Sequence, residues 1–392
     1  MPHLQPDNHP SLTSTLVLLM AVTTGVAVAS NYYAQPLLDT LADYFHISQS
    51  MAGNVVTIAQ LSYGTGLLLA VPIADIVERR ALMINLLALT CVGLMISAFS
   101  PNIYWLFVGT AMTGFCSVVA QVLVPFAATL AAPQNRGHIV GRVMAGLLLG
   151  ILMARVFAGG LSTFVNWRWV YGLAALILAG ITIALAQILP HAPSTQHIRY
   201  RQLIGSVLKL FQQQPILVYR SLLGMMSFCL FSMFWTPLAF LLAKPPYQYS
   251  DAIIGLFGLV GAAGVMAATW AGKLADAGHG RQATFAGLVG LIISWGLLYF
   301  SPHSLTLLLV GVVLLDLTSQ LVHVSNQNVI YSLDESIRNR LNAGYMTCYF
   351  IGGAFGSWLS VTLYQIGGWS WVSLAGLSIA SLALLVALYK HQ

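Results

Sequence analysis

Residues 304–331 read SLTLLLVGVVLLDLTSQLVHVSNQNVIY, a long apolar stretch that contains one charged side chain, Asp316. A helix needs about 20 mostly apolar residues to cross the hydrocarbon core of a membrane, so this stretch is predicted to span one. The composition of the chain agrees, because 58% of its 392 residues are hydrophobic and 7% are charged. An ordinary soluble domain carries roughly 25% charged residues. A soluble fold is therefore excluded.

Twelve such stretches, nearly free of Lys, Arg, Asp and Glu, follow one another along the chain. In the first half they are Leu16–Leu37, Met51–Ala74, Ala81–Phe99, Ile103–Ala131, Val143–Val165 and Trp169–Leu189. In the second half they are Ser221–Ala243, Ala252–Gly272, Thr284–Ser301, Ser304–Tyr331, Leu341–Ile366 and Trp369–Tyr389. We expect an all-α membrane protein with twelve transmembrane helices.

The basic residues predict the orientation of these helices, because Lys and Arg in short loops stay on the cytoplasmic side. With both termini in the cytoplasm, only Arg168 and Lys244 of the 16 basic residues fall outside, and Arg155 falls within the membrane. The net charge of +6 thus follows from topology, and no nucleic-acid partner is expected. Residues 1–11 contain no Lys or Arg that would mark a signal peptide, so the first helix is expected to be retained.

The two halves of the sequence repeat at an offset of 201 to 202 residues. Matching residues at this offset include Pro36 with Pro237, Asp75 with Asp276, Arg136 with Arg338, Gly150 with Gly352, and Trp167 with Trp369. We therefore predict two pseudo-symmetric six-helix bundles, residues 1–195 and 216–392, joined by a polar cytoplasmic linker, residues 196–215. Parallel repeats of this kind occur in transporters whose binding site lies between the halves.

No enzyme or cofactor site is indicated. The four cysteines lie inside predicted spans without the paired spacing of a disulfide or zinc site. Neither a phosphate-binding Gly-x-x-x-x-Gly-Lys-Ser/Thr element nor a His or Cys pair at ligand spacing occurs. We expect a protein that is not an enzyme, that binds no cofactor or metal, and that uses an ion gradient as its energy source.

The loops after the second and eighth helices carry the motif of a known family. Gly272-Lys-Leu-Ala-Asp276 with Gly280-Arg281, and Ile73-Ala-Asp75 with Arg79-Arg80, resemble the signature Gly-x-Leu-Ala-Asp-Arg-x-Gly-Arg-Arg of the major facilitator superfamily. The resemblance covers nearly the whole chain and implies a cytoplasmic gating motif, formed by Asp75, Arg79, Arg80, Gly272, Asp276 and Arg281. In this interpretation the motif latches one half to the other, and the alternative is that it only anchors the loops in the cytoplasm.

Further stretches, residues 31–38, 120–125 and 352–357, resemble bacterial drug:proton antiporters of this superfamily. The antiporter signature of the fifth helix is Gly-x-x-x-Gly-Pro-x-x-Gly-Gly. Gly146 and Gly150 match it, whereas Ile151 replaces the proline and Arg155 intrudes. The resemblance favours export.

Asp316 and Arg155 are the two charged residues that fall clearly within predicted spans. Such charges are costly in a membrane and mark functional sites. Counting 1.5 Å per residue places the two at similar depth, so we expect a contact between halves that forms and breaks as they rock. Burial favours the neutral form of a carboxyl group, which makes Asp316 the candidate proton carrier. The alternative is a static ion pair that holds two helices together.

Polar residues on four helices form the candidate substrate cavity. Its members are Asn31, Tyr32 and Gln35 of the first helix, Ser117 and Gln121 of the fourth, Trp235 and Thr236 of the seventh, and Gln320 and Gln327 of the tenth. His323 shares the face of Asp316, Gln320 and Gln327, and it either relays protons or simply bonds a neighbour. Amide and aromatic groups suit an amphiphilic ligand.

These observations predict a secondary active transporter of a bacterial inner membrane, functional as a monomer. Its expected activity is proton-coupled efflux of a small amphiphilic molecule or metabolite by alternating access. The alternative is proton-coupled import of a small anionic or zwitterionic solute that Arg155 attracts. A membrane-embedded enzyme or a channel is the remote alternative. The expected partners are the small-molecule substrate, protons and the lipid bilayer.

Overall fold

The computed structural model describes residues 13–132, 134–191, 199–262, 280–333 and 337–389. These ranges contain helices and connecting turns and no β-strand. The first helices are α1 (Ser14–Ala29), α2 (Leu38–Phe45), α3 (Gln49–Leu69), α4 (Arg79–Ala98), α5 (Ile103–Cys116), α6 (Val119–Leu130), α7 (Arg136–Phe164) and α8 (Arg168–Ile188). The others are α9 (Tyr200–Gln213), α10 (Pro215–Trp235), α11 (Leu238–Ala243), α12 (Asp251–Val260), α14 (Gly280–Tyr299), α15 (Leu305–Tyr331) and α16 (Arg338–Tyr389).

Among the described residues, nine helical segments are long and apolar enough to cross a membrane, and α1 and α12 are shorter apolar helices. The longest segment, α16, is two helices that meet at Gly367 and Gly368, where Gly368 has a φ of 67°. Counting α16 twice and adding α1 and α12 gives one element for each of the twelve predicted spans. For the eighth span, only the part up to residue 262 is described.

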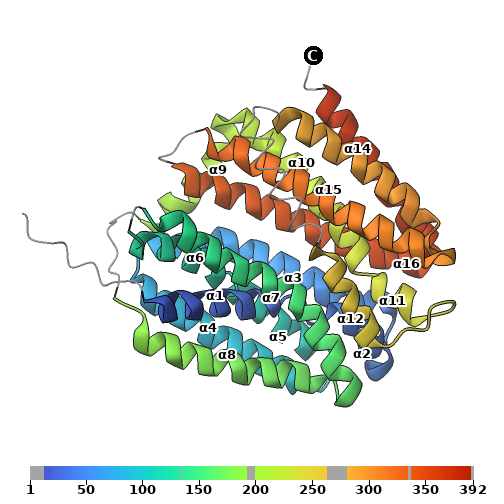
Figure 1. Cartoon of the computed structure of the whole chain (residues 1–392), viewed down its shortest axis with the longest axis horizontal. Helices are drawn as coiled ribbons and strands as arrows, with labels where there is room; N and C mark the ends of the chain where they lie inside the picture. Colours follow the sequence, from blue (N-terminus) through green and yellow to red (C-terminus); the bar gives the residue numbers. More distant parts are fainter. Residues whose placement is uncertain (1–12, 133, 192–198, 263–279, 334–336, 390–392) are drawn as a thin grey trace, which may run out of the picture.

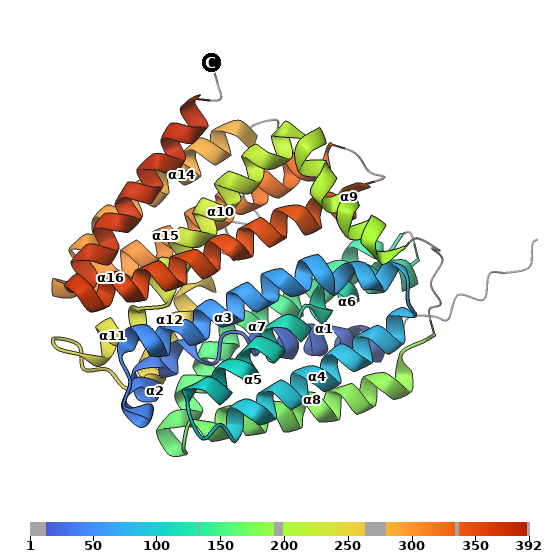
Figure 2. The ribbon, with the colours of Figure 1, turned by 180° about the vertical axis from the view of Figure 1, so that it is seen from behind.

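The helices assemble into two groups that lie side by side (Figures 1 and 2). Helices α1 and α3–α8 pack together in the lower part of Figure 1, and α10 and α14–α16 pack together in the upper part. The two groups meet where α3 contacts α16, and α12, which follows α10 and α11 in the chain, packs on α7 of the first group and also contacts α15 of the second. The domain boundaries proposed from the sequence, at residues 195 and 215, stay a prediction.

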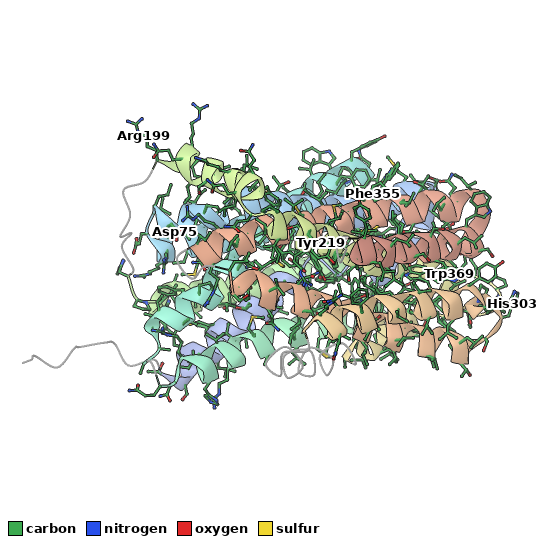
Figure 3. The ribbon with its side chains drawn as sticks, turned by 90° about the horizontal axis from the view of Figure 1, so that it is seen from above. Asp75, Arg199, Tyr219, His303, Phe355 and Trp369 are labelled. Atoms are coloured by element: carbon green, nitrogen blue, oxygen red, sulfur yellow. The ribbon has the colours of Figure 1, made fainter. Side chains whose placement is uncertain are left out.

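The labelled loop residues identify the two ends of the helix bundle. Figure 3 shows Asp75 and Arg199 at one end and His303 at the opposite end. The first of these is the predicted cytoplasmic end, and the second is the predicted outer end.

Glycines allow close approach of helices within both groups, because helices can pack closely where small residues face each other. A Cβ atom on Gly150 of α7 would collide with the backbone of Gly25 in α1, and one on Gly352 of α16 would collide with the backbone of Met225 in α10. These glycines therefore serve the packing of α1 on α7 and of α10 on α16.

Candidate functional site

The first and seventh predicted spans are each interrupted at a proline. Helix α1 ends at Ala29, and a turn leads into the short 3₁₀ helix Gln35–Leu37, whose second residue is Pro36. Helix α10 ends at Trp235, just before Pro237. Proline lacks a backbone N–H and disfavours a helical residue before it, so neither helix continues smoothly. In transporters, interrupted helices of this kind commonly form the binding site.

Arg155 of α7 is enclosed by side chains from these two breaks. Its side chain is 3% exposed, and its Nε donates a hydrogen bond of 2.6 Å to Oε1 of Gln35. The guanidinium carbon lies 5.1 Å from the ring centre of Tyr32 and 4.2 Å from that of Trp235. Its Nη2 has no hydrogen-bond partner, and no carboxylate of the described residues forms an ion pair with it. The positive charge is therefore stabilised mainly by two aromatic faces and one amide.

Asp316 of α15 lies at the N–H edge of the Trp235 indole. Its side chain is also 3% exposed, and its Oδ1 accepts a hydrogen bond of 3.1 Å from the Trp235 indole N–H. Arg155 and Asp316 are the only charged side chains that are buried within the described ranges. We call the set Tyr32, Gln35, Arg155, Trp235 and Asp316 the central cluster.

The central cluster links the two charges through a third residue. In this conformation no ion pair joins Arg155 and Asp316 directly among the described residues, and the Trp235 indole contacts both, with its face toward the guanidinium and its N–H toward the carboxylate. A direct contact that forms and breaks as the halves rock stays a prediction. Five of the predicted site residues are thus brought together, in an arrangement that residue depth alone did not predict.

Two glycines of the α12 segment fit the central cluster closely, and sequence reasoning missed them. A Cβ on Gly258 would lie 3.0 Å from Cβ of Arg155, and one on Gly261 would lie 2.8 Å from Oδ2 of Asp316. The spacing Gly255-x-x-Gly258-x-x-Gly261 was a signal for close packing that could have found them.

The remaining residues of the polar face of α15 lie apart from the central cluster. His323 Nδ1 is 2.9 Å from the Tyr345 hydroxyl, and the imidazole packs on the Tyr345 and Tyr349 rings. Gln327 donates to the Tyr331 hydroxyl at 3.4 Å, and Gln320 is half-buried. His323 thus has a hydrogen-bonding neighbour, which fits one of its two predicted roles. Its other predicted role, the relay of protons, stays a prediction.

Four other predicted cavity residues form hydrogen bonds between neighbouring segments. Asn31 Nδ2 donates to the Ser117 hydroxyl at 2.7 Å, which ties the break after α1 to the end of α5. The Thr236 hydroxyl donates to that of Ser357 at 3.1 Å. Gln121 Nε2 donates to the Tyr63 hydroxyl at 3.3 Å. These contacts position the helices around the central cluster.

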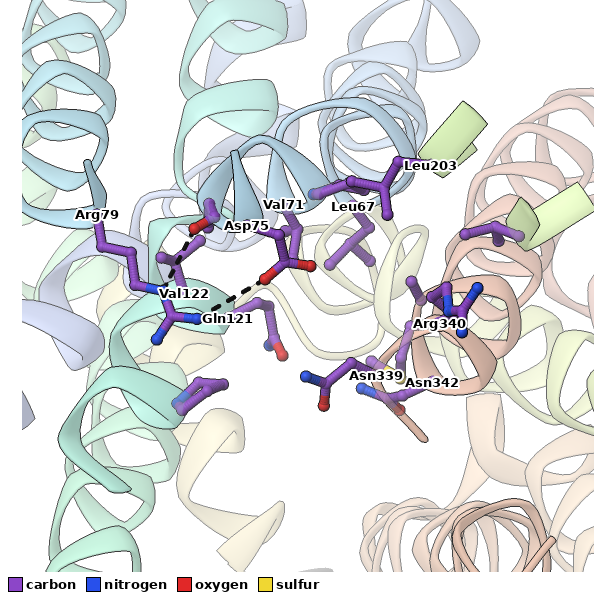
Figure 4. Close-up of a pocket in the computed structure, with 16 residues that line it drawn as sticks. Leu67, Val71, Asp75, Arg79, Gln121, Val122, Leu203, Asn339, Arg340 and Asn342 are labelled. Atoms are coloured by element: carbon purple, nitrogen blue, oxygen red, sulfur yellow. Dashed lines mark hydrogen bonds and ion pairs between the residues drawn. The ribbon is translucent and has the colours of Figure 1, made fainter. Parts of the chain in front are cut away.

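A cavity of about 110 Å³, which we call the vestibule, opens at the predicted cytoplasmic end. Figure 4 shows Asp75 and Arg79 on one side of it and Asn339, Arg340 and Asn342 on the other. Gln121 also lines it, together with residues of α3, α9 and α16. The vestibule therefore lies between the two groups of helices.

The predicted gating motif borders the vestibule. Arg79 lies 3.7 Å from the Asp75 carboxylate and donates to the Ala74 carbonyl at 3.3 Å. Arg80 binds the Ala186 carbonyl at 2.5 Å, and Arg281 lies over the ring of Phe285. Two further residues of the motif, Gly272 and Asp276, lie outside the described residues.

An aromatic pair lies one helical turn beyond the lining of the vestibule. Tyr63 lies one helical turn before Leu67 in α3, and Phe350 lies one turn after Met346 in α16; Leu67 and Met346 both line the vestibule. The ring centres of Tyr63 and Phe350 are 4.4 Å apart. We call this pair the aromatic seal.

The predicted outer end is closed by hydrogen bonds that sequence reasoning missed. Asp251, in the first turn of α12, accepts from the Thr40 hydroxyl of α2 at 2.7 Å and from the Ser162 hydroxyl of α7 at 3.1 Å. An acid in the first turn of a helix is common because it interacts favourably with the helix dipole, so the sequence did not indicate that Asp251 bonds other helices. We call these three residues the outer latch.

Comparison with known proteins places this architecture in a family. The Major Facilitator Superfamily model matches residues 20–333. The uncharacterized transporter YgaY of Escherichia coli O157:H7 is 51% identical over 379 residues, which cover 97% of this chain and 96% of the relative. The probable transporter SCO4007 of Streptomyces coelicolor is 31% identical over 375 residues, which cover 93% and 85%.

A solved structure shares the fold over nearly the whole length. A bacterial homolog of the human lysosomal transporter Spinster, in an inward-facing and occupied conformation, matches with a TM-score of 0.80 and 12% identity. The match covers 96% of each chain. The family model, the relatives and the solved structure agree. Each of the named proteins is described as a transporter, and none is described as an enzyme. The chain is therefore a member of the major facilitator superfamily, a multi-pass membrane transporter.

Proposed function

We propose that this protein is a proton-coupled secondary transporter that exports a small amphiphilic molecule or metabolite by alternating access. The observation that carries the proposal is the central cluster. A buried acid from one group of helices and a buried base from the other share a single indole, Trp235. Any change in the charge of Asp316 therefore alters the contact between the two groups.

The coupling step is protonation of Asp316. A buried carboxylate is stable only while it is paired or hydrogen-bonded, and protonation removes both its charge and its attraction for Arg155. The contact through Trp235 then weakens, and the bodies formed by residues 1–195 and 216–392 rotate about it. Opening to the outside breaks the outer latch, while the helices around the vestibule close.

Export is supported by the resemblance to drug:proton antiporters. The same proposal includes a bacterial inner membrane, with both termini in the cytoplasm, and a monomer as the functional unit. In this orientation the vestibule opens toward the cytoplasm, and cargo enters it from there.

A second candidate function is proton-coupled import of a small anionic or zwitterionic solute. The unpartnered Nη2 of Arg155 favours it, because a buried guanidinium without a carboxylate is suited to bind one from a ligand. Flux in everted vesicles decides between the two. Accumulation of cargo inside vesicles whose interior is acidic supports export, and its loss from them supports import.

Proton flux in proteoliposomes tests the coupling step. The wild type, Asp316→Asn and Asp43→Asn are reconstituted around a trapped pH-sensitive dye and exposed to pooled metabolites, dyes and antimicrobials. Asp43 is an exposed acid and serves as the matched control. We expect a cargo-dependent proton signal that Asp43→Asn keeps and Asp316→Asn loses. A signal that persists in Asp316→Asn contradicts the proposed role of Asp316.

A further inference from the structure

We infer that the cargo is a small zwitterion, which binds across the central cluster with its carboxylate on Arg155 and its ammonium group on Asp316. The ligand takes over the bridging position that Trp235 occupies in this structure. This inference rests on the proposed function, because it assumes that Asp316 is the coupling group, and it specifies the class of cargo.

The anion-binding part of the site is Arg155. The residue is 3% exposed, its Nη2 is unpartnered, and among the described residues its side chain donates one hydrogen bond, to the neutral amide of Gln35. The planar guanidinium has an unpartnered N–H group with which it can donate hydrogen bonds to a carboxylate. The rings of Tyr32 and Trp235 lie against the guanidinium and supply no hydrogen-bond acceptor in the plane of its N–H groups.

The cation-binding part of the site is Asp316. Within the described residues, its carboxylate accepts one hydrogen bond, from the Trp235 indole. Gly261, which has no side chain, stands beside the second oxygen. A neutral indole N–H is a weaker partner for a buried carboxylate than an ammonium group, because the ammonium also supplies the opposite charge.

The arrangement sets the shape of the ligand. One aromatic ring system bridges the guanidinium and the carboxylate, since Trp235 contacts Arg155 with its face and Asp316 with the N–H at its edge. The two charges of the ligand must be separated by a similar width. A carboxylate and an ammonium group on opposite sides of a benzene ring meet this requirement.

Charge balance then explains how cargo and proton exclude each other. Asp316 holds either a proton or the ligand ammonium, so binding of the zwitterion to the protonated site releases one proton. The carboxylate that forms is neutralised by the ammonium, and the ligand carboxylate is neutralised by Arg155. Mutual exclusion of this kind produces exchange of cargo for protons. An anion without the amine would instead favour a protonated Asp316 and produce co-transport.

Three matched compounds test the inference by calorimetric titration of the full chain in lipid nanodiscs. They are 4-(aminomethyl)benzoate, a zwitterion, and its single-charge analogues 4-methylbenzoate and 4-methylbenzylamine. Binding of the zwitterion is expected to be about tenfold tighter than that of either analogue, because it forms two charge-assisted contacts. Equal affinity for the three compounds, or no binding of the zwitterion, overturns the inference.

Variants assign the two contacts. Arg155→Gln is expected to lower affinity for the zwitterion to that for the amine, and Asp316→Asn to lower it to that for the carboxylate. Arg142→Gln changes an exposed arginine of the same helix and serves as the control. Trp235→Phe keeps a ring on Arg155 but removes the competing N–H, so it is expected to tighten binding, which a misfolded protein would not do. Unchanged affinity in Arg155→Gln contradicts the inference.

Titrations in two buffers of different ionisation enthalpy separate this inference from the proposed function. Proton release that accompanies binding of the zwitterion and disappears in Asp316→Asn supports both. Binding that depends on Arg155 without any proton release supports the zwitterion site and contradicts the coupling role of Asp316. Proton flux that depends on Asp316 with other cargo, together with no binding of the zwitterion, supports only the proposed function.

Discussion

At the scale of single residues, Trp235 determines how the two buried charges interact. Its ring stabilises the Arg155 guanidinium, and its N–H bonds the Asp316 carboxylate. A cation over an aromatic face contributes about 0.5–2 kcal/mol, and a hydrogen bond to a charged group about 1.5–3 kcal/mol. The two contacts together are small compared with the cost of leaving either charge buried and unpaired. The central cluster is therefore easily rearranged by a ligand or a proton that carries charge.

Gly261→Ala is expected to abolish most of the cargo-dependent proton flux. The added Cβ would lie 2.8 Å from Oδ2 of Asp316, so the carboxylate must move away from its present position. Gly296→Ala is the matched control, because a Cβ there meets no atom within 4 Å. Flux is measured in proteoliposomes at equal protein content. Equal flux in the two variants would show that the position of Oδ2 does not matter for coupling.

The sequence identified individual site residues better than their contacts. Asp316 and Arg155 were identifiable because a charge within an apolar stretch is conspicuous in any single sequence. The choice of Tyr32, Gln35 and Trp235 followed from their polarity and depth, but the contact of the indole with both charges did not. Gly258, Gly261 and Asp251 were missed, because a glycine or a capping acid acquires its meaning only from the helix packed against it.

At the scale of elements, apolar length predicted the spans but not their interruptions. The fourth predicted span, Ile103–Ala131, is two helices, α5 and α6, that meet at Ser117 and Val118. Hydropathy is averaged over a window and remains high across such a break. The prolines after α1 and α10, Pro36 and Pro237, occupy matching positions of the sequence repeat. This match explains why both breaks lie at the depth of Arg155. The sequence thus predicted the fold class correctly, and the structure shows where the helices are interrupted.

Gly150→Leu is expected to lower the free energy of unfolding by about 1–3 kcal/mol, because the side chain would force α7 away from α1. Any side chain at Gly150 collides with the backbone of Gly25. Gly141→Leu, in the same helix, is expected to be nearly neutral, since a Cβ there meets nothing within 4 Å. Thermal unfolding in one detergent measures both. A larger loss of stability in Gly141→Leu would contradict the packing described for α1 and α7.

At the scale of the whole molecule, four layers follow one another between the two ends. They are the vestibule, the aromatic seal, the central cluster and the outer latch. The vestibule is the layer that opens at the predicted cytoplasmic end, while the outer latch joins α2 and α7 to α12 at the opposite end. The order matches a transporter that is closed at its outer end.

The double variant Thr40→Val with Ser162→Ala is expected to shift the protein toward an outward-open conformation. It removes two hydrogen bonds to Asp251, each of which contributes about 1.5–3 kcal/mol, and so changes the population at least tenfold. Spin labels attached to cysteines introduced by Tyr44→Cys and Ile253→Cys, at two exposed positions near the outer latch, report the distance between α2 and α12. Thr65→Val is the control, because that hydroxyl bonds only the Leu61 carbonyl of its own helix. Identical distance distributions in the two variants contradict a latch.

Reporter tags at the two termini test the predicted orientation of the whole chain. Both are expected to be cytoplasmic, because this orientation leaves only Arg168 and Lys244 outside. Protection of both tags from protease in intact spheroplasts, and digestion of both in everted vesicles, supports it. Opposite behaviour of the two tags would contradict an even number of membrane spans.

The position of Arg155 and Asp316 in a layer of their own has a consequence for how such a carrier diversifies. In the proposed mechanism, the groups that select cargo belong to a different layer from the outer latch at one end and from the motif around Asp75 at the other. A mutation at residue 155 is therefore expected to alter the chemistry of the cargo while leaving the coupling acid Asp316, the outer latch and the motif around Asp75 unchanged. New specificities are within reach of one or two substitutions, so relatives that share this framework are expected to carry unrelated compounds.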